Sequence, residues 1–408
     1  MTLDLTFREA SARVIGALAS RFRSLDIAED AFAEACARAA KAWPRDGAPR
    51  DGPAWLYRTA FRAALDHIRR TKTAERLAPE PPSVEPNAED LMIDDARQIP
   101  DERLRLIFVC CHPAVAPEAR AALTLKLVCG LSTREIARAF LTPEPTLGQR
   151  IVRAKRKIAE AGVPFEIPGP EAWPERLDAV LSTLEIAYSK AHEDAALAGP
   201  YAGFAEEMLT VTRVLAELAP LEPEVHALAA IVRYGEARRP ARLDEGGAMT
   251  PLSEQDPCRW NRTLIEEAEA CLLRAADLNP AGPRALQGAI QSAWCARRSL
   301  ADPAPWSIVL ALYEALLTLR DDPVVRLNRA VALAEVLGPQ AALTEIEALD
   351  ARALGEFPPY HAVRADLLRR LGSVEEARAA YLRVLALDPA PAERLWLQRQ
   401  VRRLAPST

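Results

Sequence analysis

The chain has 408 residues, of which 50% are hydrophobic and 27% are charged, and its formal net charge is −5. This length and apolar content allow several packed domains and exclude wholesale disorder. Only 6% of the residues are aromatic, and the abundance of Ala, Leu and Arg favours helices over sheets. No apolar run is long enough for a membrane span, and the first residues lack a signal-peptide pattern. We therefore expect a cytoplasmic, all-α protein with no membrane partner.

The first segment, residues 1–72, predicts three helices at about 7–23, 27–42 and 53–71, with a Pro- and Gly-rich turn at 43–53. The third helix interleaves aromatic and basic side chains, which suits unpaired DNA because rings stack on bases while cations hold phosphates. Some of these rings must also belong to the core. The candidate DNA-binding residues of this helix are Trp55, Tyr57, Arg58, Arg62, Arg69 and Arg70.

The second predicted helix carries an acidic edge formed by Glu29, Asp30 and Glu34. By itself such an edge is typical of a solvated helix face. Residues 1–72 carry a net charge of +4, however, and an acidic patch within a basic domain is also typical of a protein docking site. Both interpretations remain open at this point.

Charge alternates strongly along the chain. The Pro-rich stretch 73–98 has a net charge of −5 and is too polar to bury a core of its own, so we predict that it is a linker. Residues 99–161 carry +5, and residues 162–408 carry −9. Two basic domains joined by an acidic linker favour a polyanionic partner, which points to nucleic acid.

The domain at 99–163 contains a helix-turn-helix pattern. Ser132 and Glu135 form a capping box that starts a helix ending near Phe140. Thr142 is then expected to cap a second helix, with Pro143 at its first position. On this helix, 143–160, apolar residues recur at helical spacing and define the core-facing side. These residues are Leu147, Ile151, Ala154 and Ile158.

The other faces of the helix 143–160 are polar and basic, as expected of a recognition helix that lies in the major groove of DNA. We expect the residues near its start to contact base edges and the later cations to contact phosphates. A solvated basic helix is the alternative. The expected base contacts are Thr146, Gln149 and Arg150, and the expected phosphate contacts are Arg153, Lys155, Arg156 and Lys157.

The remaining segment, 172–408, predicts an α-solenoid built from tetratricopeptide-like (TPR-like) hairpins, with an ordinary helical bundle as the alternative. Small and bulky apolar residues precede Pro223, Pro280, Pro323 and Pro389 at repeating offsets, and Gly372 marks a turn. The predicted repeat residues are Val211, Leu215 and Leu218; Ala268, Leu272 and Ala275; Ala311, Ala315 and Thr318; and Ala377, Tyr381 and Val384.

The sequence predicts no catalytic site, metal or cofactor. Cys110, Cys111 and His112 are adjacent in sequence and cannot all reach one tetrahedral ion comfortably, so buried thiols are expected instead. No nucleotide-binding or hydrolase motif is present, and the seven cysteines form no disulfide framework.

Taken together, the quoted motifs resemble those of bacterial sigma factors of the extracytoplasmic-function type in the sigma-70 family, in a subgroup with a C-terminal TPR-like extension. Ala28-Glu-Asp30 with Glu34 resembles the core-polymerase-binding region, and Pro53-Ala-Trp-Leu56 with Asp66 and Arg69-Arg70 resembles the region that melts and reads the −10 element. The helix-turn-helix is similar to the region that reads the −35 element. The extension resembles the subgroup at Gln255–Asn261, Asn328–Ala332 and Tyr360–Gly372.

The resemblance implies an initiation factor with core RNA polymerase and promoter DNA as partners, and it adds Asp66 to the −10 set. Arg62 stands where the family usually has asparagine, and Ala33 where it usually has glutamine. The resemblance further implies that the extension governs activity, through a protein partner or an intramolecular one. Because the linker and extension are acidic and the two domains are basic, we expect that the extension can fold back and mask a basic domain. Two rivals remain: a helix-turn-helix regulator that acts without polymerase, and a TPR-like adaptor whose N-terminal half is a tether.

Overall fold

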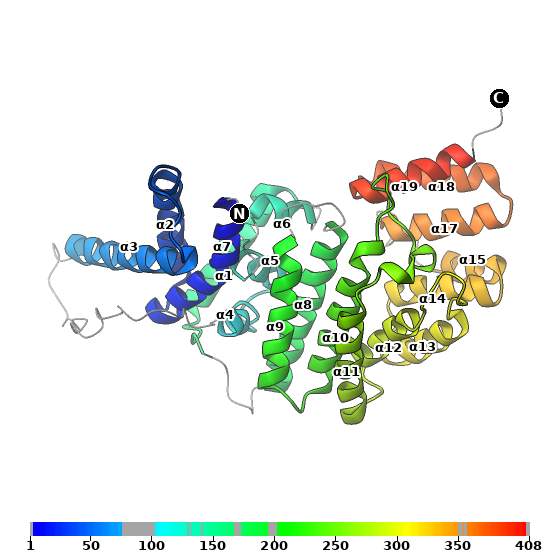
Figure 1. Cartoon of the computed structure of the whole chain (residues 1–408), viewed down its shortest axis with the longest axis horizontal. Coiled ribbons are helices and arrows are strands. Elements are labelled where there is room, and N and C mark those ends of the chain that lie inside the picture. The colour runs from blue at the N-terminus through cyan, green and yellow to red at the C-terminus, as the bar shows by residue number, and fades with distance from the viewer. Residues whose placement is uncertain are drawn as a thin grey trace. The chain divides into compact units, whose positions relative to one another are not determined.

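A computed structural model describes residues 3–75, 103–166, 173–194, 202–349 and 357–404, apart from residues 129, 131, 140 and 141, together with residue 354. The described chain is helical, with one isolated β-bridge between Leu243 and Met249 (Figure 1). The prediction of an all-α protein is therefore confirmed. The linker predicted at 73–98 falls almost entirely outside the described residues.

The chain divides into two compact units. The first contains residues 1–191 and 200–207, and the second contains residues 192–199 and 208–408. None of the described helices is long and apolar enough to cross a membrane.

The N-terminal lobe of the first unit consists of α1 (Leu3–Phe22), α2 (Leu25–Asp46) and α3 (Gly52–Glu75). Ser24 caps α2 by accepting a hydrogen bond from the Ile27 amide at 3.3 Å. The helix runs four residues past its predicted end, with Pro44 inside its last turn, and stops at Gly47, whose φ of 84° suits glycine. Asp51 then caps α3 through the Ala54 amide at 2.9 Å.

The helix-turn-helix lobe consists of α4 (Arg103–Cys110), α5 (Pro117–Leu127), α6 (Thr133–Ala139) and α7 (Glu144–Glu160). Ser132 precedes α6 as predicted, and its carbonyl accepts from the Ile136 amide at 3.1 Å; the side chain of Glu135 is not among those described. The prediction for Thr142 is wrong by one position. The N-cap of α7 is Pro143, which makes no side-chain cap bond, and Pro145 occupies the first turn.

Helix α8 (Trp173–Asp194) packs against the helix-turn-helix lobe through the part that lies in the first unit. Arg176 donates to the Phe108 carbonyl at 2.9 Å and lies over the Phe108 ring at 6.0 Å. The Thr183 hydroxyl is hydrogen-bonded to the buried Cys111 thiol. The first helix after residue 172 is thus tied to the lobe that precedes it.

Helix α9 (Ala202–Leu218) contributes to both units, and the second unit continues with neighbouring helices packed in chain order (Figure 1). This sequential packing is the pattern expected of an α-solenoid. The helices are α10 (Pro223–Arg238), α11 (Arg262–Leu278), α12 (Pro283–Cys295), α13 (Trp306–Leu319), α14 (Pro323–Val336), α15 (Pro339–Glu347), α17 (Pro358–Arg370), α18 (Val374–Ala386) and α19 (Pro391–Arg403).

The predicted repeat residues agree with the structure in part. Ala377, Tyr381 and Val384 are fully buried, and Gly372, with φ of 82°, forms the turn between α17 and α18. Ahead of Pro323, by contrast, the prediction is wrong, because Ala311, Ala315 and Thr318 are exposed. Helix α13 turns its larger side chains, Val309, Leu310 and Leu316, into the core instead.

The stretch between α10 and α11 contains three short 3-10 turns, Arg239–Ala241, Leu252–Glu254 and Pro257–Arg259. It reaches α19, since the Met249 amide donates to the Ala392 carbonyl at 3.0 Å and Arg399 binds Asp244. Leu252 packs against two core clusters of this unit. The interruption of the helical repeat therefore joins helices far apart in sequence.

Candidate nucleic-acid and polymerase interfaces

Helix α7 presents the predicted recognition surface. Its four predicted core residues, Leu147, Ile151, Ala154 and Ile158, are all buried. Burial of this stripe fixes the rotation of the helix, so the remaining faces point away from the core. Thr146, Gln149, Arg153, Arg156 and Lys157 are exposed, whereas Arg150 and Lys155 are half-buried.

The cations of α7 differ in their partners. Arg156 and Lys157 pair with Glu160 of the same helix at 3.3 and 3.0 Å, and such exposed pairs dissociate at little cost. Within the described part of the chain, Arg150 and Arg153 have no ion pair. Lys155 instead contacts Asp26 and Glu29 of α2, at 2.5 and 2.9 Å. The first half of the helix is therefore open to a ligand, while Lys155 is already engaged.

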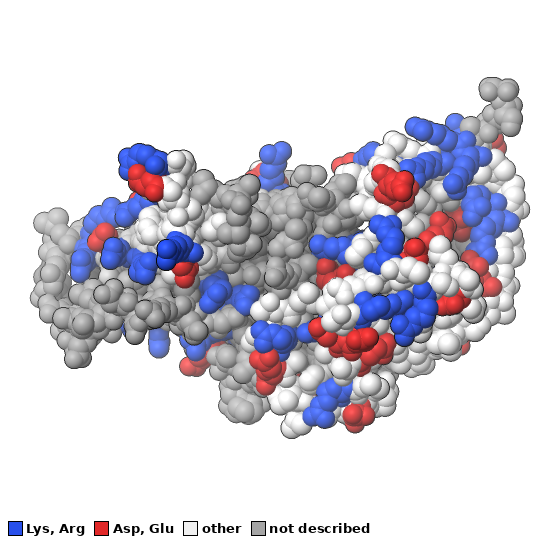
Figure 2. Space-filling view, in the orientation of Figure 1, with Lys and Arg blue, Asp and Glu red and all other residues white. Residues whose placement is uncertain are grey.

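Helix α3 presents the second predicted DNA surface. Arg58, Arg62, Asp66, Arg69 and Arg70 are all exposed, and Figure 2 shows basic side chains along this helix. The helix exposes these charges because Ala54, Leu56, Ala60 and Ala64 occupy its buried side.

The aromatic residues of α3 belong largely to the core. Tyr57 is 8% exposed, so the prediction that it stacks on a base is not supported by its position. The ring of Trp55 is half-buried and meets Trp43 edge-on, with ring centroids 5.5 Å apart. Phe61 packs on Phe22 at 5.3 Å. Trp55 and Phe61 are both half-buried, whereas Tyr57 is buried, so Trp55 is the aromatic residue of the candidate set that keeps some exposure.

The three carboxylates of the acidic edge of α2 differ in accessibility. Asp30 is exposed, and Glu34 is exposed while paired with Arg38 at 2.9 Å. The Glu29 side chain is only 16% exposed, because it lies between Lys155 at 2.9 Å and Lys126 at 3.8 Å. The structure therefore leaves two of the three predicted polymerase-binding carboxylates accessible and engages the third.

Asp26 and Lys126 complete this ion cluster, and the sequence did not single them out. Asp26 lies 129 positions before Lys155, so no local periodicity connects the two. The contact depends on how the helix-turn-helix lobe packs on the N-terminal lobe, and helical patterning within a lobe carries no information on that.

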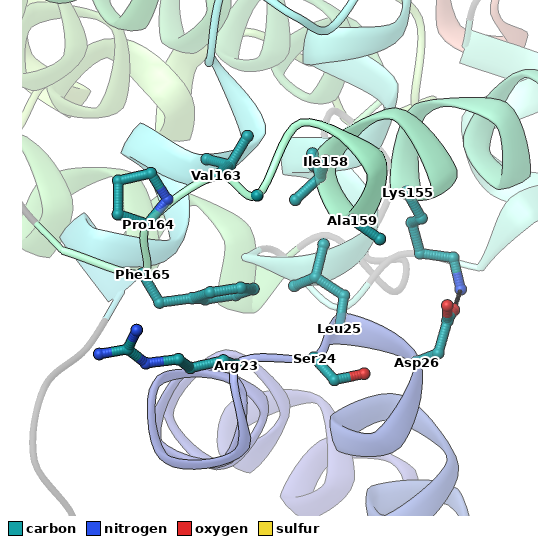
Figure 3. Close-up of a pocket in the computed structure, with 11 residues that line it drawn as sticks. Arg23, Ser24, Leu25, Asp26, Lys155, Ile158, Ala159, Val163, Pro164 and Phe165 are labelled. Carbon is teal, nitrogen blue, oxygen red and sulfur yellow. Dashed lines mark hydrogen bonds and ion pairs between the residues drawn. The ribbon is translucent and has the colours of Figure 1, made fainter. Parts of the chain in front are cut away.

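A cavity of about 300 Å³ lies beside the ion cluster, between the turn that joins α1 to α2 and the end of α7 (Figure 3). Leu25, Ile158, Val163, Pro164 and Phe165 line it with apolar surface. In the view of Figure 3, the Phe165 ring lies between Leu25 and Arg23. A pocket with both apolar and charged walls thus lies where the two lobes meet.

The Cys110-Cys111-His112 sequence is a packing element. Both thiols are buried, and burial raises the pKa of Cys111, which favours the neutral thiol. The Nδ1 atom of His112 accepts from the Ala114 amide at 3.1 Å. Burial, together with the nearby Arg176 and Arg120, lowers the pKa of His112. In the described residues, no three His, Cys, Asp or Glu side chains converge as metal ligands.

A helix-turn-helix with a basic second helix, beside a second exposed basic helix, defines a nucleic-acid-binding protein of the all-α class. Comparison with known families agrees with this. Residues 6–74 match sigma-70 region 2, and residues 105–158 match sigma-70 region 4. Residues 176–276 match a family of unknown function, DUF6596.

An uncharacterized protein of Rhizobium meliloti (strain 1021) is 40% identical over 409 residues, which cover 99% of this chain and 96% of that protein. The chain belongs to the sigma-70 family of transcription initiation factors and carries a C-terminal helical extension. The resemblance noted in the sequence is thereby confirmed at the level of the family.

Proposed function

We propose that this RNA polymerase sigma factor is of the extracytoplasmic-function type and brings core polymerase to promoters with two separate DNA elements. The observation that supports this most strongly is the pair of basic helices, α3 and α7, which lie on different lobes and expose cations beside a buried apolar stripe. Because transcription initiation requires polymerase and chromosome together, we place the protein in the cytoplasm. The extracytoplasmic-function type rests on the motif resemblance.

In this proposal α7 enters the major groove of the −35 element. Thr146, Gln149 and Arg150 lie in its first two turns, where recognition helices contact base edges. Arg153, Lys155, Arg156 and Lys157 follow and contact phosphates, which fixes the register without reading sequence. The accessibility of Gln149 and Arg153 supports this assignment.

Helix α3 binds the unpaired strand of the −10 element. Trp55 stacks on an unpaired base, and Arg58, Arg62, Arg69 and Arg70 hold the backbone, with Asp66 between them. Because Tyr57 is buried, we assign it to the core that supports this surface. Core polymerase binds the acidic edge of α2 through Glu29, Asp30 and Glu34.

In vitro transcription with purified core polymerase tests the proposal, with start sites mapped across genomic DNA. We expect specific starts only when the chain is added. Reversal of charge at Arg150 and Arg153 removes initiation but leaves association with polymerase intact. Tight promoter binding by the chain without polymerase favours an independent regulator instead. Full activity after the charge reversal favours an adaptor.

We also propose that the extension regulates the factor, through a partner protein or by masking a basic surface. Because α8 packs on the helix-turn-helix lobe, the fragment to compare with the full chain ends at residue 191 and not at residue 172. Masking predicts tighter promoter binding and a steeper salt dependence for the fragment. Equal affinities and slopes contradict it.

A further inference from the structure

Helices of the second unit meet in a consistent way, with an arginine of one helix paired to a glutamate of a neighbouring helix. Arg370 of α17, for example, lies 2.6 Å from Glu335 of α14. Such pairs select the charge of the neighbour even where they add little stability. The other pairs join α10 to α11, α12 to α10, α14 to α13 and to α15, and α17 to α15. They are Arg233–Glu267, Arg284–Glu224, Arg329–Glu314, Arg329–Glu345 and Arg364–Glu347.

The last hairpin of the unit, α18 and α19, ends this series. The buried side of α19 packs on α18, where Leu397 shares a core cluster with Tyr381. Its other side carries Leu395, Arg399 and Arg402, at i, i+4 and i+7, which places them on one face of the helix. All three side chains are exposed, so no described helix covers this face.

The uncovered face of the hairpin is partly apolar. Leu382 of α18 is 44% exposed and Leu395 of α19 is 40% exposed. Each lies four residues from the end of its helix at the turn 387–390, so the two leucines lie at the same level of the hairpin. The terminal repeat of a solenoid normally has a polar outer face, which keeps the array soluble. Paired exposed leucines at this position indicate an unfilled contact.

The same hairpin lies in the basic end of an acidic extension. Residues 358–404 contain nine arginines and five acidic residues, a net charge of +4, whereas residues 162–357 carry −13. Figure 2 shows basic side chains over α18 and α19. Arg402 and Arg403 are exposed and have no ion pair within the described part of the chain. The last turn of α19 therefore has two cations available for a partner.

Arg399 shows what this face of α19 binds. It holds the carboxylate of Asp244, which comes from the stretch between α10 and α11, 155 positions earlier. Gly246 leaves room for this contact, because a Cβ there would lie 2.8 Å from the Arg399 guanidinium. The face thus already accepts one carboxylate from a distant segment.

We propose that the outer face of the last hairpin, defined as Leu382, Leu395, Arg402 and Arg403, docks an amphipathic helix of another protein whose apolar side is flanked by acidic residues. This helix continues the packing of the unit. Its apolar side covers the two leucines, and its carboxylates pair with the two arginines, as glutamates do at the earlier helix contacts.

The mixture of side chains favours a protein partner over nucleic acid. Arginine is enriched in protein interfaces, whose centres are apolar, whereas a surface that binds phosphates gains its affinity from cations and not from leucines. The inference names a surface and a partner chemistry for the regulation by a partner protein proposed above, and its regulatory role rests on that proposal. Docking itself does not require that the chain initiates transcription.

Fluorescence anisotropy with the full chain tests the docking surface. The probe is a labelled helical peptide of about 18 residues, or about five turns, with leucines on one side and glutamates on both flanks. Arg402→Glu combined with Arg403→Glu replaces two attractive pairs by repulsion, so we expect about 10-fold weaker binding. A second peptide, with lysine in place of every glutamate, should show the opposite preference and bind this double variant more tightly than the parent chain.

The matched control is Arg274→Glu combined with Arg298→Glu. These two arginines are exposed, belong to the same unit and lie outside the last hairpin, so the change in net charge is identical. The control variant should bind both peptides as the parent does. Hydrogen exchange read by mass spectrometry needs no variant, and the glutamate peptide should slow exchange of amides in α18 and α19.

Three results overturn the docking surface. The first is equal binding of the glutamate peptide by the parent and the Arg402/Arg403 variant. The second is slower exchange confined to the first unit. The third is a variant that loses affinity for a short DNA duplex while its peptide binding is unchanged, which assigns the surface to nucleic acid.

In vitro transcription separates this inference from the proposals beneath it. If the peptide docks and transcription by the holoenzyme is unchanged, the proposed regulation is wrong and the docking surface stands. If the peptide docks and the chain supports no initiation with core polymerase, the proposed function fails alone. If transcription is normal and the peptide does not dock, the inference fails alone.

Discussion

The ammonium of Lys155 and the carboxylate of Glu29 lie 2.9 Å apart although 126 positions separate them in the chain. This pair divides α7 into two parts. Arg153, two residues earlier, is exposed and unpaired among the described residues, whereas Lys155 is covered by the N-terminal lobe. The cations of one helix should therefore differ in what they contribute to DNA binding.

Arg153→Ala should weaken promoter binding by the holoenzyme to a similar degree for every promoter sequence. A phosphate contact carries no base information, and its loss should reduce the slope of log affinity against log salt by about 1. Fluorescence anisotropy on labelled promoter duplexes, over a salt series, measures both quantities. Arg326→Ala is the control, because Arg326 lies on α14 and is held by Asp321 at 2.6 Å. A change of preferred sequence without a change of slope contradicts the assignment.

Two glycine substitutions should act in opposite directions on stability. Gly148 lies within α7, where a Cβ would meet only Thr133 at 3.9 Å, an ordinary contact. Gly148→Ala should stabilise the helix-turn-helix lobe by up to about 1 kcal/mol. Gly372 has φ of 82° with open space around it, so Gly372→Ala should destabilise the second unit by about 1 to 2 kcal/mol through backbone strain alone. Chemical denaturation of the full chain, followed separately for each unit, measures the change in the free energy of unfolding that each substitution causes.

The local structure was predictable wherever short-range patterns determine it. The spacing of Leu147, Ile151, Ala154 and Ile158 gave the correct buried face of α7, since burial of one stripe fixes helix rotation. The cap of the same helix was misplaced, because Pro143 and Pro145 both suit a helix start. The burial predicted for the repeat residues before Pro323 is wrong, because small residues such as Ala311 are equally compatible with a solvent-facing helix. The ion pairs of Lys155 with Asp26 and Glu29 depend on tertiary packing, which a single sequence does not specify.

The contact between Asp244 and Arg399 should make the stability of the second unit depend on pH. The hydrogen bond from Arg399, assisted by the Ala248 amide, lowers the pKa of Asp244. A carboxyl whose folded pKa is depressed stabilises the fold above its unfolded pKa, about 3.9, and this contribution is lost as the pH falls through the folded pKa. The difference in melting temperature between the parent chain and Asp244→Asn should therefore be present at pH 6 and shrink below about pH 4. Glu245→Gln, an exposed neighbour, should show no such difference.

Helix α8 should behave as part of the helix-turn-helix lobe. A fragment of residues 1–172 leaves the Phe108 carbonyl without its Arg176 donor and the Cys111 thiol without Thr183. Loss of a hydrogen bond from a charged donor costs about 1.5 to 3 kcal/mol, so this fragment should melt about 3 to 12 °C below a fragment of residues 1–191. Arg176→Ala in the longer fragment should reproduce part of that loss, because it removes the donor and keeps the helix. Equal melting temperatures for the two fragments would show that α8 belongs functionally to the extension, and that the helix-turn-helix lobe is complete without it.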